Sequence, residues 1–289
     1  MSGFLRNILW PTDFSREASE ALHYADLFAQ TFSSAVMAVH VSPDFMPGMY
    51  QNSLPVQREL LRRQAELKKE AMEKIRALEK KRSMEFSRVI VTEGSPAKKI
   101  IEVAKKEKAD LIVMGKHGQS VLEKLIIGSV ANHVLRNSPV PVLVTKKGKR
   151  IETIRKILVP TDFTKGEETE REIAWKIARG FKASFTFLYV LELFGHEFRL
   201  VGEMVKVVEE KFKKTLEQKR SGVEVSVDII KAISAAQGIK EYARKKRSDL
   251  IVMATCVGKL SRLFLGSTTE KVIAATDLPV FAIPPKYCS

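Results

Sequence analysis

The sequence predicts an α/β protein of two tandem doubly wound domains, each a five-stranded parallel sheet in the order 3-2-1-4-5 with helices on both faces. Three observations lead to this fold class. A length of 289 residues suits two domains of about 150 residues each. The chain contains an internal repeat. Within each copy, apolar segments of strand length alternate with segments of helical period.

The internal repeat consists of four segments that return in the same order. Residues 7–14 return at 156–163, an offset of 149, and residues 110–114 return at 249–253, an offset of 139. The Gly-Ser pair at 128–129 and the closing strand near 140–142 return at an offset of 138. Small deletions account for the falling offset, so the chain is a duplication. We expect domains at residues 1–147 and 151–289, joined by a short basic linker.

Five apolar segments in each copy have the pattern of strands buried on both faces, because apolar residues follow one another instead of alternating. In the first copy they cover residues 8–11, 35–41, 88–92, 111–114 and 140–144, and in the second copy residues 156–160, 184–190, 224–230, 250–253 and 279–283.

The segments between the strands have helical period. In the first copy we expect helices at residues 15–31, with Ser15 as N-cap, at 56–82, from Pro96 onward, and at 129–135. The second helical region of the second copy is the shorter one. Strands that alternate with helices in this order predict right-handed crossovers and a covered parallel sheet.

The composition limits the protein class without identifying a partner. Lys and Arg number 49 against 34 Asp and Glu, a net charge of +15 that attracts phosphates, nucleic acid or anionic membrane. Hydrophobic residues at 45% and charged residues at 29% exclude collagen-like and largely disordered chains. Two cysteines without a C-x-x-C motif, and no leader or apolar run of membrane-spanning length, predict a cytoplasmic protein with no membrane partner.

Candidate binding residues follow the first and fourth strands, since ligands bind beyond the carboxyl ends of parallel strands where the winding direction switches. Pro11, Thr12 and Asp13 end the first strand, and the Asp13 carboxylate is well placed for ribose hydroxyls. A helix-entry role for Asp13, in competition with Ser15, is the alternative.

The fourth strand leads into the spacing G-x2-G-x9-G-S, at Gly115, Gly118, Gly128 and Ser129. The first two glycines let the backbone approach a ligand, and we expect a positive φ at Gly118. Gly128, Ser129 and the following Val130 start a helix whose N–H groups and dipole favour a phosphate. The pattern predicts a nucleotide with its sugar near the first strand and its phosphates near the fourth.

These motifs resemble those of the universal stress protein family, and the resemblance to two fused family domains covers nearly the whole chain. The glycine pattern is similar to that family's ATP-binding signature. The resemblance implies ATP as the ligand, with or without Mg²⁺ on its phosphates, held at base and ribose by Asp13 and the backbone of Val41. It also implies that the last strands, 140–144 and 278–283, pair within one chain as a pseudo-dimer, with a homodimer as a further assembly.

The second copy departs from the glycine pattern. Asp162 is kept, but Ala254 replaces the first glycine, and the loop from Gly258 to Gly266 is shorter. An added methyl group where phosphate should pass predicts a weakened or lost site, although Gly266 and Ser267 could still hold a phosphate.

Several other residues have two interpretations. His117 could touch a phosphate or be an exposed loop histidine, and Cys256 could be a reactive or a packed thiol. The basic segment Arg58–Arg82 interleaves glutamates at helical spacing, which is typical of a solvated helix and makes a nucleic-acid groove the weaker interpretation.

The sequence contains no P-loop, dinucleotide fingerprint, nucleophile elbow, kinase motif set or H-E-x-x-H metal spacing. We therefore expect a nucleotide that is bound, with at most weak hydrolysis. The prediction is a nucleotide-binding stress-response or regulatory protein, in which ATP in the first copy acts as a conformational switch toward an unknown protein partner. The alternatives are an ATPase or nucleotidyl-transfer enzyme of the same fold, and a basic nucleic-acid-binding protein.

Overall fold

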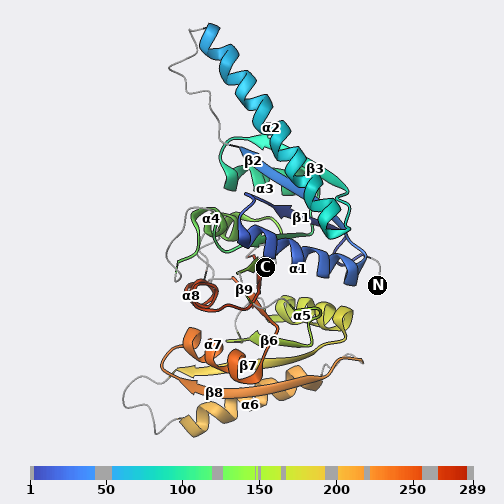
Figure 1. Cartoon of the computed structure of the whole chain (residues 1–289). Helices are drawn as coiled ribbons and strands as arrows, with labels where there is room; N and C mark the ends of the chain where they lie inside the picture. Colours follow the sequence, from blue (N-terminus) through green and yellow to red (C-terminus); the bar gives the residue numbers. More distant parts are fainter. Residues whose placement is uncertain are drawn as a thin grey trace.

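The computed structural model describes residues 3–42, 54–118, 126–146, 148, 151–163, 167–192, 201–217, 222–255 and 266–284. Their strands form one sheet in the order β3-β2-β1-β4-β5-β10-β9-β6-β7-β8 (Figure 1). The strands are β1 (Asn7–Pro11), β2 (Ala35–Ser42), β3 (Arg88–Glu93), β4 (Leu111–Gly115), β5 (Val142–Thr145), β6 (Lys156–Pro160), β7 (Ser184–Glu192), β8 (Val225–Ala232), β9 (Leu250–Ala254) and β10 (Val280–Ile283).

The helices lie on both faces of this sheet. They are α1 (Arg16–Phe32), α2 (Leu54–Arg82), α3 (Pro96–Lys106), α4 (Ser129–Asn137), α5 (Glu167–Phe181), α6 (Val201–Glu217), α7 (Ala235–Lys246) and α8 (Ser267–Ala275). Ser15 caps α1 as predicted, because its Oγ accepts a hydrogen bond from the amide of Ala18 at 3.1 Å. The fold class is confirmed, with the predicted strand order in each half.

Apolar layers cover both faces of the sheet and cross from one copy into the other. Neighbouring residues of β1 show why its apolar residues do not alternate with polar ones: Ile8 packs into one layer and Leu9 into the other. Buried residues of α1, α2, α5 and α6 belong to the first layer, and those of α3, α4, α7 and α8 to the second.

The two copies join through β5 and β10, which pair antiparallel, while every other strand pair among the described residues is parallel. Val142 lies opposite Ala282, and Val144 lies opposite Val280. The predicted pairing of the last strands within one chain is therefore confirmed. β5 begins two residues later than predicted, where Pro141, which has no N–H to donate to a ladder, precedes the strand.

Side chains reinforce this seam between the copies. The ring of Phe28 in α1 lies 5.1 Å from that of Phe181 and 6.3 Å from that of Phe281, both in the second copy. Lys146 pairs with Asp277 at 2.5 Å. Ring packing and this ion pair therefore add to the β5–β10 ladder in joining the copies.

The basic segment is the solvated helix that the charge spacing indicates. In α2, Arg62 and Arg63 each lie 3.2 Å from the carboxylate of Glu66. Only Ala71 and Ile75 of this helix are buried, and its first half extends beyond the sheet (Figure 1).

Candidate functional site

The loops after β1 and β4 meet at one edge of the sheet because these strands are neighbours, with Ile8 opposite Leu111. A Cβ atom placed on Gly118 would lie only 2.6 Å from Oδ2 of Asp13. The structure therefore brings together the carboxylate and the glycine loop, which lie about 100 residues apart in the chain.

Asp13 contacts the entry of α1 and also faces the glycine loop. Its Oδ1 accepts a hydrogen bond from the amide of Ser15 at 2.9 Å, so the side chain is fixed at the entry to α1. Its other oxygen faces Gly118. Ser15, and not Asp13, provides the side-chain cap of the helix.

Gly118 does not have the positive φ that we expected. Among the described glycines, only Gly3, Gly94 and Gly222 have one. The requirement for glycine at position 118 comes instead from close packing, because any side chain there would meet the carboxylate of Asp13.

Glu17 of α1 holds the glycine loop in place, and the sequence pattern did not single out this residue. Glu17 Oε2 accepts a hydrogen bond from the amide of His117 at 2.7 Å, and its Oε1 lies 3.2 Å from His117 Nδ1. A Cβ on Gly115 would lie 2.9 Å from the Cβ of Glu17. The first glycine therefore lets α1 lie directly against the loop.

His117 is neither an exposed loop histidine nor a side chain free to reach a phosphate. Its side chain is 8% exposed, and its Nε2 contacts the carbonyl oxygen of Ile126 while Nδ1 faces Glu17. Both ring nitrogens are engaged, so the ring fastens the two ends of the loop to each other and to α1.

Helix α4 begins beside this loop as predicted. Gly128 is its N-cap, and the amide of Gly128 donates to the carbonyl of Lys116 at 3.0 Å. Ser129 is exposed and Val130 is half-buried. The first N–H groups of a helix have no partner within it, so the amino end of α4 has the chemistry to accept an anion next to Gly118.

Val41 lies at the same edge, near the end of β2. The neighbouring His40 has its Nδ1 2.8 Å from the carbonyl of Thr12, the residue between Pro11 and Asp13. The ring of Phe14 lies 4.7 Å from that of His40, and Phe14 has a φ of 63°. An aromatic residue with its backbone in the left-handed region is unusual, and nothing in the sequence pattern indicated it.

A buried carboxyl group lies at the corresponding edge of the second copy. Glu170 is 5% exposed, and its Oε1 accepts a hydrogen bond from the amide of Ala254 at 2.8 Å. Burial, followed by the charges of Asp162 and Glu167, raises the pKa of Glu170 well above its ordinary value. The expectations for Cys256, Gly258 and most of this loop lie outside the described residues.

The raised pKa predicts that Glu170 destabilises the protein as pH rises. Folding takes up a proton wherever the unfolded carboxyl, with a pKa near 4.5, is ionised and the folded one is not, so stability falls as pH increases through this window. The variant Glu170→Gln keeps an oxygen acceptor for Ala254 and cannot ionise. As pH rises from acid to neutral, we expect the variant to become more stable than the parent, by about 1.4 kcal/mol in free energy of unfolding for each pH unit within this window.

Urea unfolding of the parent and of Glu170→Gln at acid and neutral pH measures this effect. Glu168→Gln is the matched control, because Glu168 lies on the same helix with its side chain 82% exposed. A stability difference between parent and Glu170→Gln that does not change with pH would contradict the prediction.

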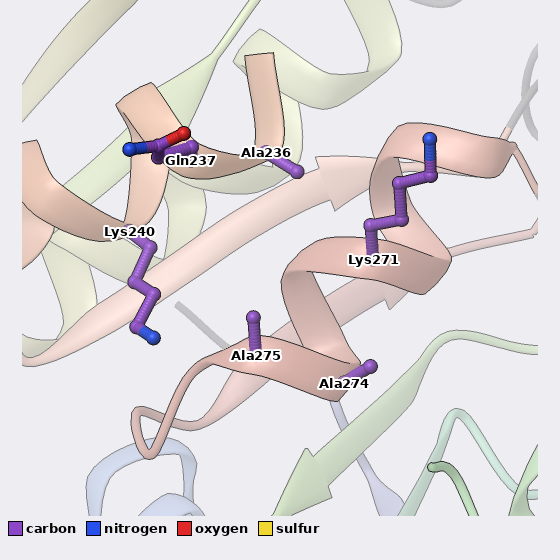
Figure 2. A pocket seen from close by; sticks show the side chains of 6 residues that line it. All are labelled: Ala236, Gln237, Lys240, Lys271, Ala274 and Ala275. Atoms are coloured by element: carbon purple, nitrogen blue, oxygen red, sulfur yellow. The ribbon is translucent and has the colours of Figure 1, made fainter. Parts of the chain in front are cut away.

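An open groove of about 320 Å³ lies on the second copy, between α7 and α8 (Figure 2). Ala236, Gln237 and Lys240 approach it from α7, and Lys271, Ala274 and Ala275 approach it from α8. Its walls combine small apolar side chains with exposed lysines, and it contains no residue of the predicted nucleotide site.

The described residues were also compared with what a metal site and a membrane-spanning helix require. Within them, no three His, Cys, Asp or Glu side chains gather into a group that could hold a metal ion. None of the described helices is both long and apolar enough to cross a membrane.

The fold and this edge define a duplicated, doubly wound α/β protein with a glycine loop facing a strand-end carboxylate. The family model described as "Universal stress protein family" matches it twice, at residues 5–146 and 153–284. The chain therefore belongs to the universal stress protein family, as a stress-response protein with two family domains in tandem.

Individual relatives agree with this assignment. Universal stress protein MJ0531 of Methanocaldococcus jannaschii is 37% identical over 150 residues, which cover 50% of this chain and 84% of the relative. Universal stress protein MJ0577 of the same organism is 30% identical over 160 residues, 51% of this chain and 98% of the relative. The crystal structure of a universal stress protein from Archaeoglobus fulgidus covers 96% of both chains with a TM-score of 0.66 at 24% identity, a likeness of fold.

Proposed function

We propose that the protein binds an adenine nucleotide, ATP with or without Mg²⁺, at the edge formed by the first copy. The observation that carries this proposal is the close approach of Gly118 to Asp13, whose Oδ2 would lie 2.6 Å from a Cβ at position 118, beside the amino end of α4. A carboxylate suits ribose hydroxyls, and the start of a helix suits phosphate. The backbone of Val41 would lie near the base.

The differences between the two copies support a single nucleotide site. In the second copy, Ala254 takes the place of Gly115, and the carboxyl of Glu170 is buried against its amide. The methyl group of Ala254 also takes space where the first copy has only a glycine hydrogen. We propose that this copy serves as the structural partner of the first, and that the nucleotide-bound loop changes the surface offered to a protein partner in the cytoplasm.

Titration calorimetry of the full chain with ATP tests the proposed function. We expect one tight site per chain, because only the first copy has the complete glycine loop. Two equivalent sites would refute the asymmetry between the copies, and no binding would refute the function. Mg²⁺-dependent turnover lost in Asp13→Asn would instead indicate an ATPase, and affinity for DNA that falls steeply with salt would indicate a nucleic-acid-binding protein.

A further inference from the structure

Lys116 contacts three different parts of the molecule from inside the glycine loop. Its amide donates to the carbonyl of Thr145 at the end of β5 at 2.7 Å, and its carbonyl accepts from Gly128 at 3.0 Å. Its ammonium group donates to the carbonyl of Ala274, which belongs to the second copy. The side chain is 1% exposed. A residue of the candidate nucleotide loop thus reaches across the seam.

The acceptor of this contact lies in the last turn of α8. The final carbonyls of a helix have no partner within the helix and carry the negative end of its dipole, so a buried ammonium group is a suitable partner. Ala274 also lines the groove between α7 and α8 (Figure 2). The loop of the first copy therefore holds one wall of a surface groove on the second copy.

The equivalent residue of the second copy makes no such connection. Thr255 has the same backbone contact as Lys116, since its amide donates to the carbonyl of Ile283 at 2.8 Å. Its Oγ1, however, donates to that same carbonyl at 3.0 Å and stays within its own copy. Of these two equivalent positions, only the one beside the intact glycine loop crosses the seam.

The charge state of Lys116 is sensitive to its surroundings. Burial, together with the charge of Lys146, lowers the pKa of Lys116 to about 8, while Glu17 and Asp277 act in the opposite direction. Phosphates bound at the loop would favour the protonated form. That form donates the stronger, charge-assisted hydrogen bond to a carbonyl.

We propose that Lys116 is a positioning residue that couples nucleotide occupancy in the first copy to the last turn of α8 in the second copy. This inference rests on the proposed function, because the nucleotide is the ligand that biases the loop. Coupling between two sites is reciprocal. Nucleotide binding should tighten the end of α8, and loss of the Lys116–Ala274 contact should weaken nucleotide binding.

Amide hydrogen exchange of the full chain, with and without ATP, tests the coupling. The variant Lys116→Met keeps both backbone hydrogen bonds and a long unbranched side chain, and removes only the ammonium group. In the parent we expect ATP to slow exchange in the last turn of α8, where the amide of Thr276 bonds Val272, by about fivefold or more. In Lys116→Met this protection should be absent, and the turn should exchange faster even without ATP.

Lys146→Met is the matched control, because Lys146 also crosses the seam, to Asp277, but lies outside the glycine loop. It should keep the ATP-dependent protection of α8. Equal protection in the parent and in Lys116→Met would overturn the coupling, as would ATP binding to the parent without any protection of α8. Absence of ATP binding to the parent, measured by calorimetry, would refute the proposed function and the coupling together.

The pH dependence provides an independent readout. In the parent, the protection of α8 by ATP should be full at pH well below 8. It should decline at pH above about 8, because Lys116 then loses its proton. In Lys116→Met, ATP should not change the amide exchange of this turn at any pH. Protection in the parent that persists at pH well above the pKa of Lys116 would show that the ammonium group does not carry the coupling.

Discussion

The variant Gly118→Val is expected to bind ATP at least tenfold more weakly, a loss of about 1.4 kcal/mol, while its fold survives. The first atom of the new side chain would lie 2.6 Å from Oδ2 of Asp13, so the carboxylate must turn away from its position. Because Asp13 is only half-buried, it can turn toward solvent without disturbing the core. The carboxylate that is predicted to bind the ribose hydroxyls is then out of position. The valine also narrows the space through which the phosphates would reach the amino end of α4.

Titration calorimetry measures the change in affinity, and circular dichroism checks the fold. Gly202→Val is the matched control, because a Cβ on Gly202 would meet no atom within 4 Å and this glycine lies in α6 of the second copy. An affinity for ATP that is the same in Gly118→Val as in the parent would show that the nucleotide takes another path.

The fold was largely predictable because several independent sequence signals agree. The repeat alone establishes that both halves share one topology. The unbroken apolar strands require cover on both faces, and this requirement is met by the two apolar layers that meet across β1 at Ile8 and Leu9. Strand ends were the weaker part of the prediction. Val140 is apolar like its neighbours, but the following proline has no N–H to donate to the ladder, and β5 begins at Val142.

The candidate site was predictable only where backbone geometry depends on glycine and on strand order. Asp13 and Gly118 meet because β1 and β4 are neighbours, which the topology implies. The roles of Glu17 and Lys116 depend on which elements lie against the loop, and this is decided by tertiary packing. Glu17 looks like an ordinary acidic residue in the first turn of a helix, where the dipole already favours it. Lys116 looks like one more cation in a basic chain.

The role of Glu170 in the second copy could not be predicted from the sequence for a similar reason. It lies in the acidic run that opens α5, with Glu167 and Glu168, and such a run is typical of a solvated helix start. Only the packing of α5 against β9 brings this one carboxyl to the amide of Ala254. The sequence shows the loss of the glycine, but it does not show that Glu170 accepts the hydrogen bond from the amide of Ala254.

The seam between the copies should weaken if β5 loses the backbone donor of Val142. Ile112 and Lys116 donate to the carbonyls of Pro141 and Thr145, so the odd-numbered residues of β5 direct their backbone groups toward β4. Backbone groups alternate along a strand, and Val142 therefore directs its amide toward β10. Proline at position 142 removes that donor from the seam and leaves the pairing with β4 in place.

We expect Val142→Pro to lower the free energy of unfolding by about 1 to 3 kcal/mol, the cost of leaving a buried acceptor of β10 without its donor. It should also loosen the two halves, so that limited proteolysis cuts the linker after Lys146 faster than in the parent. The matched control is Val142→Ala, which loses side-chain volume but keeps the amide, and its linker should be cut at close to the parental rate. Phe28, Phe181 and Phe281 still join the copies in both variants, so the difference between proline and alanine reports the backbone ladder itself. A linker cut equally fast in Val142→Pro and in the parent, with an unchanged solution radius, would mean that the aromatic contacts hold the copies together without the β5–β10 ladder.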